Sequence, residues 1–130
     1  MKKIKEIIIR AVTKIVYRNF DVIIAGYNTV KLNKIKLLPN VNIDPTSGFR
    51  NTSEIYIIGQ LKELTIYKNV QFLKFCNIVL DGSGTLIIHE NVFFNNYCSV
   101  NCLGRIEIGE NSIFGEGVRI YDHNHDFSFD

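Results

Sequence analysis

The sequence has none of the features that stabilise secreted domains or anchor membrane-spanning ones. Its 130 residues include three cysteines, an odd number that cannot all pair with one another. No uncharged apolar stretch reaches the ~18 residues that a bilayer-crossing helix needs. The apolar segment after Lys5 is interrupted by Arg10 and Lys14, so no signal peptide is evident. We therefore expect a cytoplasmic protein with reduced thiols.

A strong overall charge is also absent. The formal net charge is +2, which gives no electrostatic field suited to nucleic acid. The charge is unevenly distributed, because residues 2–19 contain six Lys or Arg and one Glu, for a net of +5. The apolar content of 46% is ordinary for a globular chain, and the length predicts a single domain.

The most informative feature that is present is a nine-residue internal repeat. Each copy has aliphatic residues in its first and third positions, Asn in the sixth and a large apolar residue in the ninth. The first interval between copies is longer than the two that follow it, which are nearly equal. The four copies are IKLLPNVNI from Ile35, LTIYKNVQF from Leu64, LIIHENVFF from Leu86 and IEIGENSIF from Ile106.

Each copy predicts a strand, a polar turn and a second strand. Alternate residues of a strand face the same way, and Asn tolerates the left-handed backbone of tight turns. Large apolar residues also recur every six positions, as in Ile88, Phe94 and Val100, with smaller residues such as Cys98 four positions after them. Three such steps make one triangular coil of about eighteen residues, and the coils stack around a shared core. The extra length of the first interval predicts a loop, DPTSGFRNTSE.

This pattern resembles the hexapeptide-repeat acyltransferases. The segment IEIGENSIFGEGVRIYDHNHDF is similar to that family's motif I-x-I-G-x-N-x-x-I-G-x-x-V-x-I-x-D-H-x-H over its whole length. The resemblance covers residues 35–126 and is strongest to O-acetyltransferases of capsular and other surface polysaccharides and to sugar acetyltransferases. It implies an all-β fold, a left-handed parallel β-helix of about four coils. The left-handed winding comes from the resemblance alone.

The N-terminal segment has a different pattern. Ile4, Ile8, Val12 and Ile15 fall at helical spacing with Lys and Arg opposite them. We expect an amphipathic helix in residues 1–20 and the β-helix domain in residues 21–130. The helix either caps the open end of the coil stack, where apolar rungs and strand edges need covering, or lies on an anionic membrane.

The resemblance implies transfer of an acetyl group from acetyl-CoA, as co-substrate, to a sugar hydroxyl, with no bound cofactor. It makes His125 the general base, and an imidazole suits that role because its pKa lies near the working pH. Asp122, Asp126 or a backbone carbonyl would hold the other ring nitrogen. The resemblance also implies a homotrimer, because the family builds its site between neighbouring subunits.

Three residues are candidates for substrate binding. FFNNYCS resembles a family stretch whose Asn contacts the acceptor sugar, and the matching residue is Asn95, which could instead bond the backbone of a corner. Asp122 and His123 adjoin the proposed base and are expected to contact substrate. His123 and His125 lie two residues apart, which permits a metal site with Asp122 or Asp126 adding oxygen ligands. A histidine pair without further spaced ligands is a weak signal, however, so no metal is expected. The alternative for both histidines is a solvated end of the chain.

Two other functions stay open. Members of the family continue past the histidine into coils that shape the channel for CoA, with a W-I-G-x-G corner, and these motifs are missing here. The chain is therefore either an enzyme or a truncated, non-catalytic remnant or structural trimerisation module. A metal-dependent β-helix enzyme resembling the carbonic anhydrases would need three histidines across coils, and only His89 and the terminal pair exist.

Overall fold

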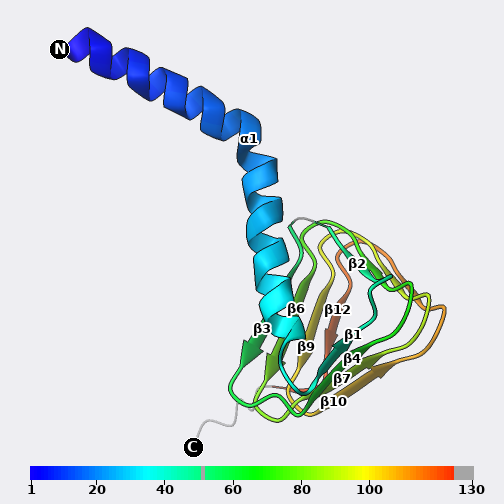
Figure 1. The fold of residues 1–130 in the computed structure, drawn as a ribbon. Helices are drawn as coiled ribbons and strands as arrows, with labels where there is room; N and C mark the ends of the chain where they lie inside the picture. The colour runs from blue at the N-terminus through cyan, green and yellow to red at the C-terminus, as the bar shows by residue number, and fades with distance from the viewer. Residues whose placement is uncertain (51, 125–130) are drawn as a thin grey trace, which may run out of the picture.

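The chain forms one long helix followed by a parallel β-solenoid of four coils (Figure 1). The computed structural model describes residues 1–50 and 52–124. Helix α1 covers Lys2–Lys36. Each coil contributes one strand to each of three parallel sheets, so each strand pairs with its equivalent in every adjacent coil.

Twelve strands build the three faces of the solenoid. Sheet A contains β1 (Val41–Ile43), β4 (Glu63–Ile66), β7 (Thr85–Ile88) and β10 (Arg105–Ile108). Sheet B contains β2 (Gly48–Phe49), β5 (Gln71–Phe72), β8 (Phe93–Phe94) and β11 (Ile113–Phe114). Sheet C contains β3 (Glu54–Ile58), β6 (Asn77–Asp81), β9 (Ser99–Cys102) and β12 (Arg119–Tyr121).

The strand register confirms the predicted stacking of the last three repeats. Leu64 pairs with Leu86, and Leu86 with Ile106. Phe94 lies between Phe72 and Phe114 in the same way. The prediction of a β-helix of about four coils is therefore confirmed as a parallel β-solenoid, while its left-handed winding stays a prediction.

The core is a set of inward-facing columns that run the length of the stack. In one of them, the rings of Phe49, Phe72, Phe94 and Phe114 stack with centroids 4.5–4.8 Å apart. Phe72 and Phe94 are each 1% exposed. Cys76, Cys98 and Cys102 are all buried in the core.

The predicted Asn turns are present in three coils. Asn69, Asn91 and Asn111 have φ angles of 58°, 58° and 61°, the left-handed geometry that most side chains avoid. Their amides also form a ladder, because Nδ2 of Asn69 donates to Oδ1 of Asn91 at 3.2 Å and Nδ2 of Asn91 donates to Oδ1 of Asn111 at 3.1 Å. The turn residue thus contributes to stacking as well as to the corner itself.

The predicted register of the first repeat is wrong. Val41, and not Ile35, pairs with Leu64, and Phe49 pairs with Phe72. Thr46 therefore stands in the turn position expected for Asn40, and its Oγ1 accepts a hydrogen bond from the N–H of Asn69 at 2.9 Å.

The expected loop DPTSGFRNTSE is wrong for the same reason, because it contains β2 and the first residue of β3. In the observed register, the first coil is about as long as the second. Thr46 and Asn69 are separated by 23 positions, and Asn69 and Asn91 by 22. No extra length is left for a long loop.

The N-terminal helix is confirmed but is longer than expected, because it continues past residue 20 to Lys36. Leu32 and Ile35, in its last turns, pack against the core of the solenoid. Ile35 was expected to begin a strand, but here it covers the end of the stack. Within residues 1–50 and 52–124, no helix combines the length and the apolar character that crossing a membrane requires.

The phenylalanine column predicts a large difference between two adjacent residues. We expect Phe94→Ala to lower the free energy of unfolding by about 3–5 kcal/mol, because it leaves a cavity in the middle of the stack. Phe93 lies next in sequence but is only half-buried, on the outside of sheet B. Phe93→Ala should therefore cost much less in urea denaturation, and equal losses would contradict the inward column.

The left-handed corner at Asn91 can be tested with two substitutions. Asn91→Gly removes the amide ladder but keeps a residue that accepts positive φ, whereas Asn91→Ala loses both. We expect the alanine variant to be less stable than the glycine variant by about 1 kcal/mol, measured by chemical denaturation. If the glycine variant is the less stable of the two, the conformational entropy that glycine loses on folding outweighs the strain of a positive φ for alanine at this corner.

Candidate functional site

Asp122 begins the predicted active-site segment and is fixed to the corner between sheets C and A. It follows β12 directly, and the register of β12 with β9 places it above the buried Cys102. Its carboxylate accepts hydrogen bonds from the backbone N–H groups of Leu103 at 2.9 Å and Gly104 at 2.7 Å. Only 11% of its side chain is exposed. Asp122 therefore anchors the fourth coil to the corner of the third.

These contacts keep Asp122 ionised. Burial raises the pKa of the carboxyl group, but the hydrogen bonds from Leu103 and Gly104, aided by His123 and Cys102, outweigh it and hold the pKa at about 2. Asp122 thus presents a full negative charge at neutral pH. The substrate contact expected for Asp122 stays a prediction.

His123 lies against this carboxylate. Its Nδ1 is 3.2 Å from Oδ1 of Asp122, and its ring meets that of Tyr121 edge-on with centroids 6.0 Å apart. About 23% of its side chain is exposed. A carboxylate that accepts from Nδ1–H makes Nε2 the basic nitrogen of the ring. His123 is consequently oriented, and its predicted contact with substrate stays open to test.

Cys102 is the third member of this cluster. Its Sγ lies 3.6 Å from Oδ2 of Asp122 and 3.2 Å from the carbonyl oxygen of Thr85. Burial, together with the negative charge of Asp122, raises the pKa of the thiol to about 11. Because only a thiolate is a competent nucleophile, Cys102 is a core residue and not a catalyst at neutral pH.

Asn95 lies at a different corner, between sheets B and C. It follows β8 and is half-buried, and its Oδ1 accepts a hydrogen bond from the N–H of Asn96 at 2.8 Å. Its own N–H donates to the carbonyl of Phe114 at 3.0 Å. In the single chain, Asn95 therefore bonds the backbone of its corner, which was the alternative to a sugar contact.

The structure does not bring Asn95 together with Asp122 and His123. The two corners lie at opposite ends of sheet C, with the length of β9 between them. A strand of that length spans about 13 Å. One acceptor sugar could not contact both corners of the same chain.

Two predicted residues, His125 and Asp126, lie outside the described residues. His89 stacks on Tyr67 with centroids 5.2 Å apart, and its Nε2 lies 2.9 Å from Oε1 of Glu107. Among residues 1–50 and 52–124, no group of three His, Cys, Asp or Glu side chains is arranged to hold a metal ion.

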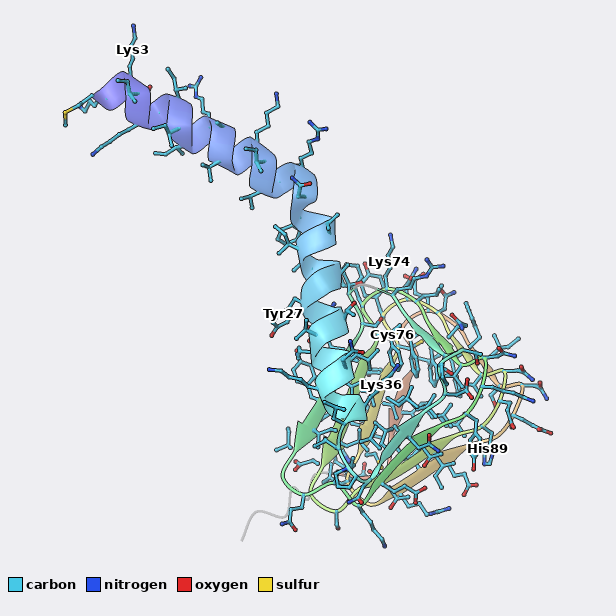
Figure 2. All side chains as sticks on the ribbon, viewed as in Figure 1. Lys3, Tyr27, Lys36, Lys74, Cys76 and His89 are labelled. Carbon is cyan, nitrogen blue, oxygen red and sulfur yellow. The ribbon has the colours of Figure 1, made fainter. Side chains whose placement is uncertain are left out.

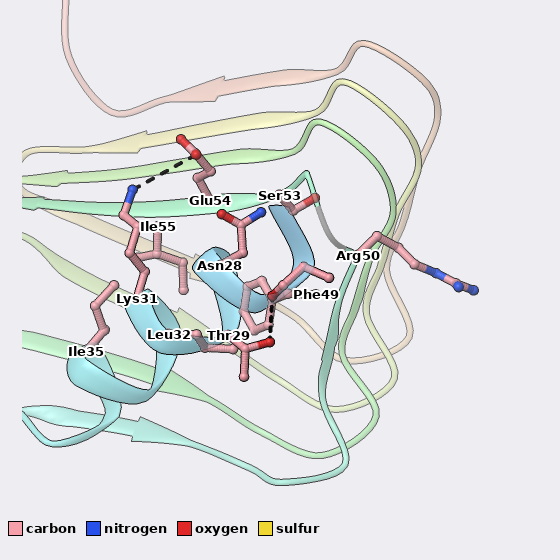
Figure 3. A pocket seen from close by; sticks show the side chains of 11 residues that line it. Asn28, Thr29, Lys31, Leu32, Ile35, Phe49, Arg50, Ser53, Glu54 and Ile55 are labelled. Carbon is pink, nitrogen blue, oxygen red and sulfur yellow. Dashed lines mark hydrogen bonds and ion pairs between the residues drawn. The ribbon is translucent and has the colours of Figure 1, made fainter. Parts of the chain in front are cut away.

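A small cavity lies between α1 and the first coil (Figure 3). Its volume is about 50 Å³, and Leu32, Phe49 and Ile55 form its apolar wall. Nζ of Lys31 and Oε1 of Glu54, 4.0 Å apart, lie at its rim. A space of this size holds a water molecule or two but not a sugar or CoA. We regard it as a packing space under the helix.

The role of the backbone at the third coil was not evident from the sequence. The N–H groups that donate to Asp122 belong to the backbone of Leu103 and Gly104, so the residue types at these positions do not indicate the contact. Asp122 and Cys102 are nevertheless separated by 20 positions, the same interval that separates Asn91 from Asn111 in the last two repeats. The sequence therefore contained one indication of this contact, which is an acidic residue, Asp122, at a position that the repeat places in an inward-facing column.

Tyr121 was also missed as a neighbour of this site. Hydrogen bonds with Ser99 and Arg119 lower the pKa of its hydroxyl, and its ring forms the edge contact with His123. A tyrosine at the end of a strand has no pattern that marks it for such a role.

Comparison of the chain with protein-family models, curated proteins and solved structures finds no match. The resemblance to the hexapeptide-repeat acyltransferases therefore depends on the motif and on the solenoid.

The anchoring of Asp122 predicts a pH-dependent contribution to stability. Its pKa of about 2 lies below the ordinary value of 3.8, so its ionised form stabilises the folded state above about pH 4 and this contribution is lost as the pH falls through 2. We expect Asp122→Asn to lower the free energy of unfolding by about 2 kcal/mol at pH 7, and the difference from wild type to shrink between pH 4 and 2.

Asp81→Asn, on strand β6 of the same sheet, is the matched control for the loss of one negative charge. Chemical denaturation of the three proteins across this pH range would check the prediction. A difference between wild type and Asp122→Asn that is independent of pH would contradict the anchoring of the ionised carboxylate.

Proposed function

We propose that this chain is a CoA-dependent O-acetyltransferase that modifies a sugar hydroxyl, in the biosynthesis of surface or capsular polysaccharide. One observation carries the proposal: the segment that matches the family's histidine motif starts at a corner of a parallel solenoid, where Asp122 is bonded to the coil beneath it. The motif and the architecture that normally presents it thus occur in one chain.

The chemistry assigned to His125 is a single acyl transfer. Its neutral imidazole takes the proton of the acceptor hydroxyl while the hydroxyl oxygen attacks the thioester carbonyl of acetyl-CoA. The C–S bond then breaks, and the leaving thiolate of CoA receives the proton from the imidazolium. Proton transfer of this kind contributes about 10²–10⁴-fold to the rate.

Asp122 supports this role through position. It fixes the chain three residues before His125, and it orients His123 within the same segment. A catalytic group held in one geometry loses less entropy on reaching the transition state, so a rigid start to the segment favours catalysis.

A homotrimer would bring the two corners together. Asn95 and His123 lie at opposite ends of sheet C, so one sugar cannot contact both residues of the same chain. One sugar can contact both only when the Asn95 corner of one subunit faces the His123 corner of a neighbouring subunit. A heterologous contact of this type closes into a ring when three copies are related by a threefold axis. We therefore propose that Asn95 and the histidine segment are contributed by different subunits.

A second function is a trimerisation module without catalysis. Phe114, Val118 and Ile120 of the fourth coil are partly buried in the single chain. Partly exposed apolar side chains are suited to contacts between subunits. The module would use the same solenoid to hold three chains together.

An acetyl-CoA transfer assay on wild type and His125→Ala tests the proposal. We expect the substitution to lower kcat by about 10²–10⁴-fold, and His89→Ala, which changes a partly buried histidine just after β7, to leave it unchanged. Equal rates for wild type and His125→Ala would contradict the assignment of the base. A trimer by light scattering with no turnover in wild type would support the module instead.

A further inference from the structure

The first half of α1 extends away from the solenoid. All of residues 1–20 are exposed, and Figure 1 shows this half of the helix projecting from the coil stack. The second half behaves differently, because Leu32 and Ile35 pack on the core. In the described part of the chain, only the second half is needed to cover the end of the solenoid, so the first half has another purpose.

The exposed half has one broad apolar face. Ile4, Ile8, Val12 and Ile15 follow one another at intervals of three or four residues and are 53–63% exposed. Ile9 and Val16, on the flank of this face, are 63% and 46% exposed and widen it. Contiguous apolar surface of this kind marks an interaction site.

The opposite face carries three basic residues and one isoleucine. Lys3, Arg10 and Lys14 follow one another at helical spacing, which places them on one side of the helix, with Lys3 pointing outward in Figure 2, and Ile7, 65% exposed, lies between Lys3 and Arg10. Residues 2–19 have a net charge of +5. A partner that suits both faces must be apolar inside and negatively charged at its surface.

The helix lacks internal support at its start. Its first turn contains no acidic residue, and the cap residue Met1 makes no side-chain hydrogen bond. Lysines at the N-terminal end oppose the helix dipole, and a run of isoleucines has only moderate helix propensity. An anionic surface would neutralise the lysines, and burial of the isoleucines would stabilise the helix further.

The spacing disfavours a coiled coil between copies of the chain. A coiled-coil seam with Ile4, Ile8, Ala11 and Ile15 at its a and d positions would place Arg18 at the next of these positions. The neighbouring seam Ile8, Val12, Ile15 reaches Asn19. Coiled coils need an unbroken a/d seam over about three or four heptads, and a broad apolar face is typical of a helix that lies in a membrane interface.

We propose that residues 2–20 bind the surface of an anionic lipid bilayer, with Ile4, Ile8, Val12 and Ile15 inserted and the basic face among the lipid headgroups. This surface is independent of the acetyl transfer proposed above. It would tether the solenoid close to the membrane through the second half of α1.

Co-sedimentation of the full chain with vesicles tests this proposal. We expect strong binding to phosphatidylcholine vesicles that contain about one-third phosphatidylglycerol, little binding to phosphatidylcholine alone, and weaker binding at high salt. The triple variant Lys3→Gln, Arg10→Gln, Lys14→Gln should bind about 100-fold more weakly, because each cation contributes at an anionic surface. Lys62→Gln, Lys68→Gln, Lys74→Gln removes the same charge from the solenoid and should bind as wild type does.

A second pair of variants tests the apolar face. Ile8→Ser with Ile15→Ser should weaken vesicle binding by at least about 100-fold. Ile58→Ser with Ile113→Ser, which alters two exposed isoleucines of the solenoid, should not. Circular dichroism should show the same unfolding of the solenoid in wild type and in the two variants of the helix, since residues 1–20 are exposed.

Three results would overturn the proposal. One is equal binding to neutral and anionic vesicles, and another is no binding to either. The third is a change of oligomeric state in Ile8→Ser with Ile15→Ser while vesicle binding is unchanged, which would make this face an interface between copies of the chain.

Discussion

The register between successive coils is the constraint on which the rest of the structure depends. Each full turn must rise by one strand spacing and come back to the same place around the stack, so that a side chain facing inward meets its equivalent one coil away. The phenylalanine column shows the consequence, because its four rings stack at 4.5–4.8 Å, close to the spacing of paired strands. Stacking at that distance is possible only when the backbone hydrogen bonds and the side chains share one register.

The corners follow from this constraint. A short strand must turn sharply without losing its place, and the positive φ of Asn69, Asn91 and Asn111 allows that turn. Asp122 uses a corner in another way, because its carboxylate accepts hydrogen bonds from two N–H groups of the coil below. The segment proposed to carry the base therefore begins where the chain is bonded to the stack.

Helix α1 combines two physical tasks in one element. Its last turns cover apolar side chains that the first coil would otherwise expose, and so they belong to the solenoid. Its first half makes no such contribution, and its apolar and basic faces are both exposed. A single helix with one buried end and one exposed end can link a folded domain to a surface. That arrangement would suit an acceptor sugar carried on a lipid. Binding of residues 2–20 to a bilayer is proposed from the apolar and basic residues of the helix alone.

The last three coils and the core residues could be predicted from the sequence, since inward positions such as Ile66, Ile88 and Ile108 recur at intervals that match their pairing. The first coil could not, because IKLLPNVNI fits the repeat as well as VNIDPTSGF does, and only the packing of Ile35 under the helix and the pairing of Val41 with Leu64 distinguish them. The sequence by itself determined the repeating pattern, because a pattern of side chains is a local property. The tertiary structure alone decided where α1 ends, which coil Asp122 is bonded to, and that Asn95 lies a strand away from His123. Those outcomes depend on backbone groups and on contacts between distant segments, which no local pattern records.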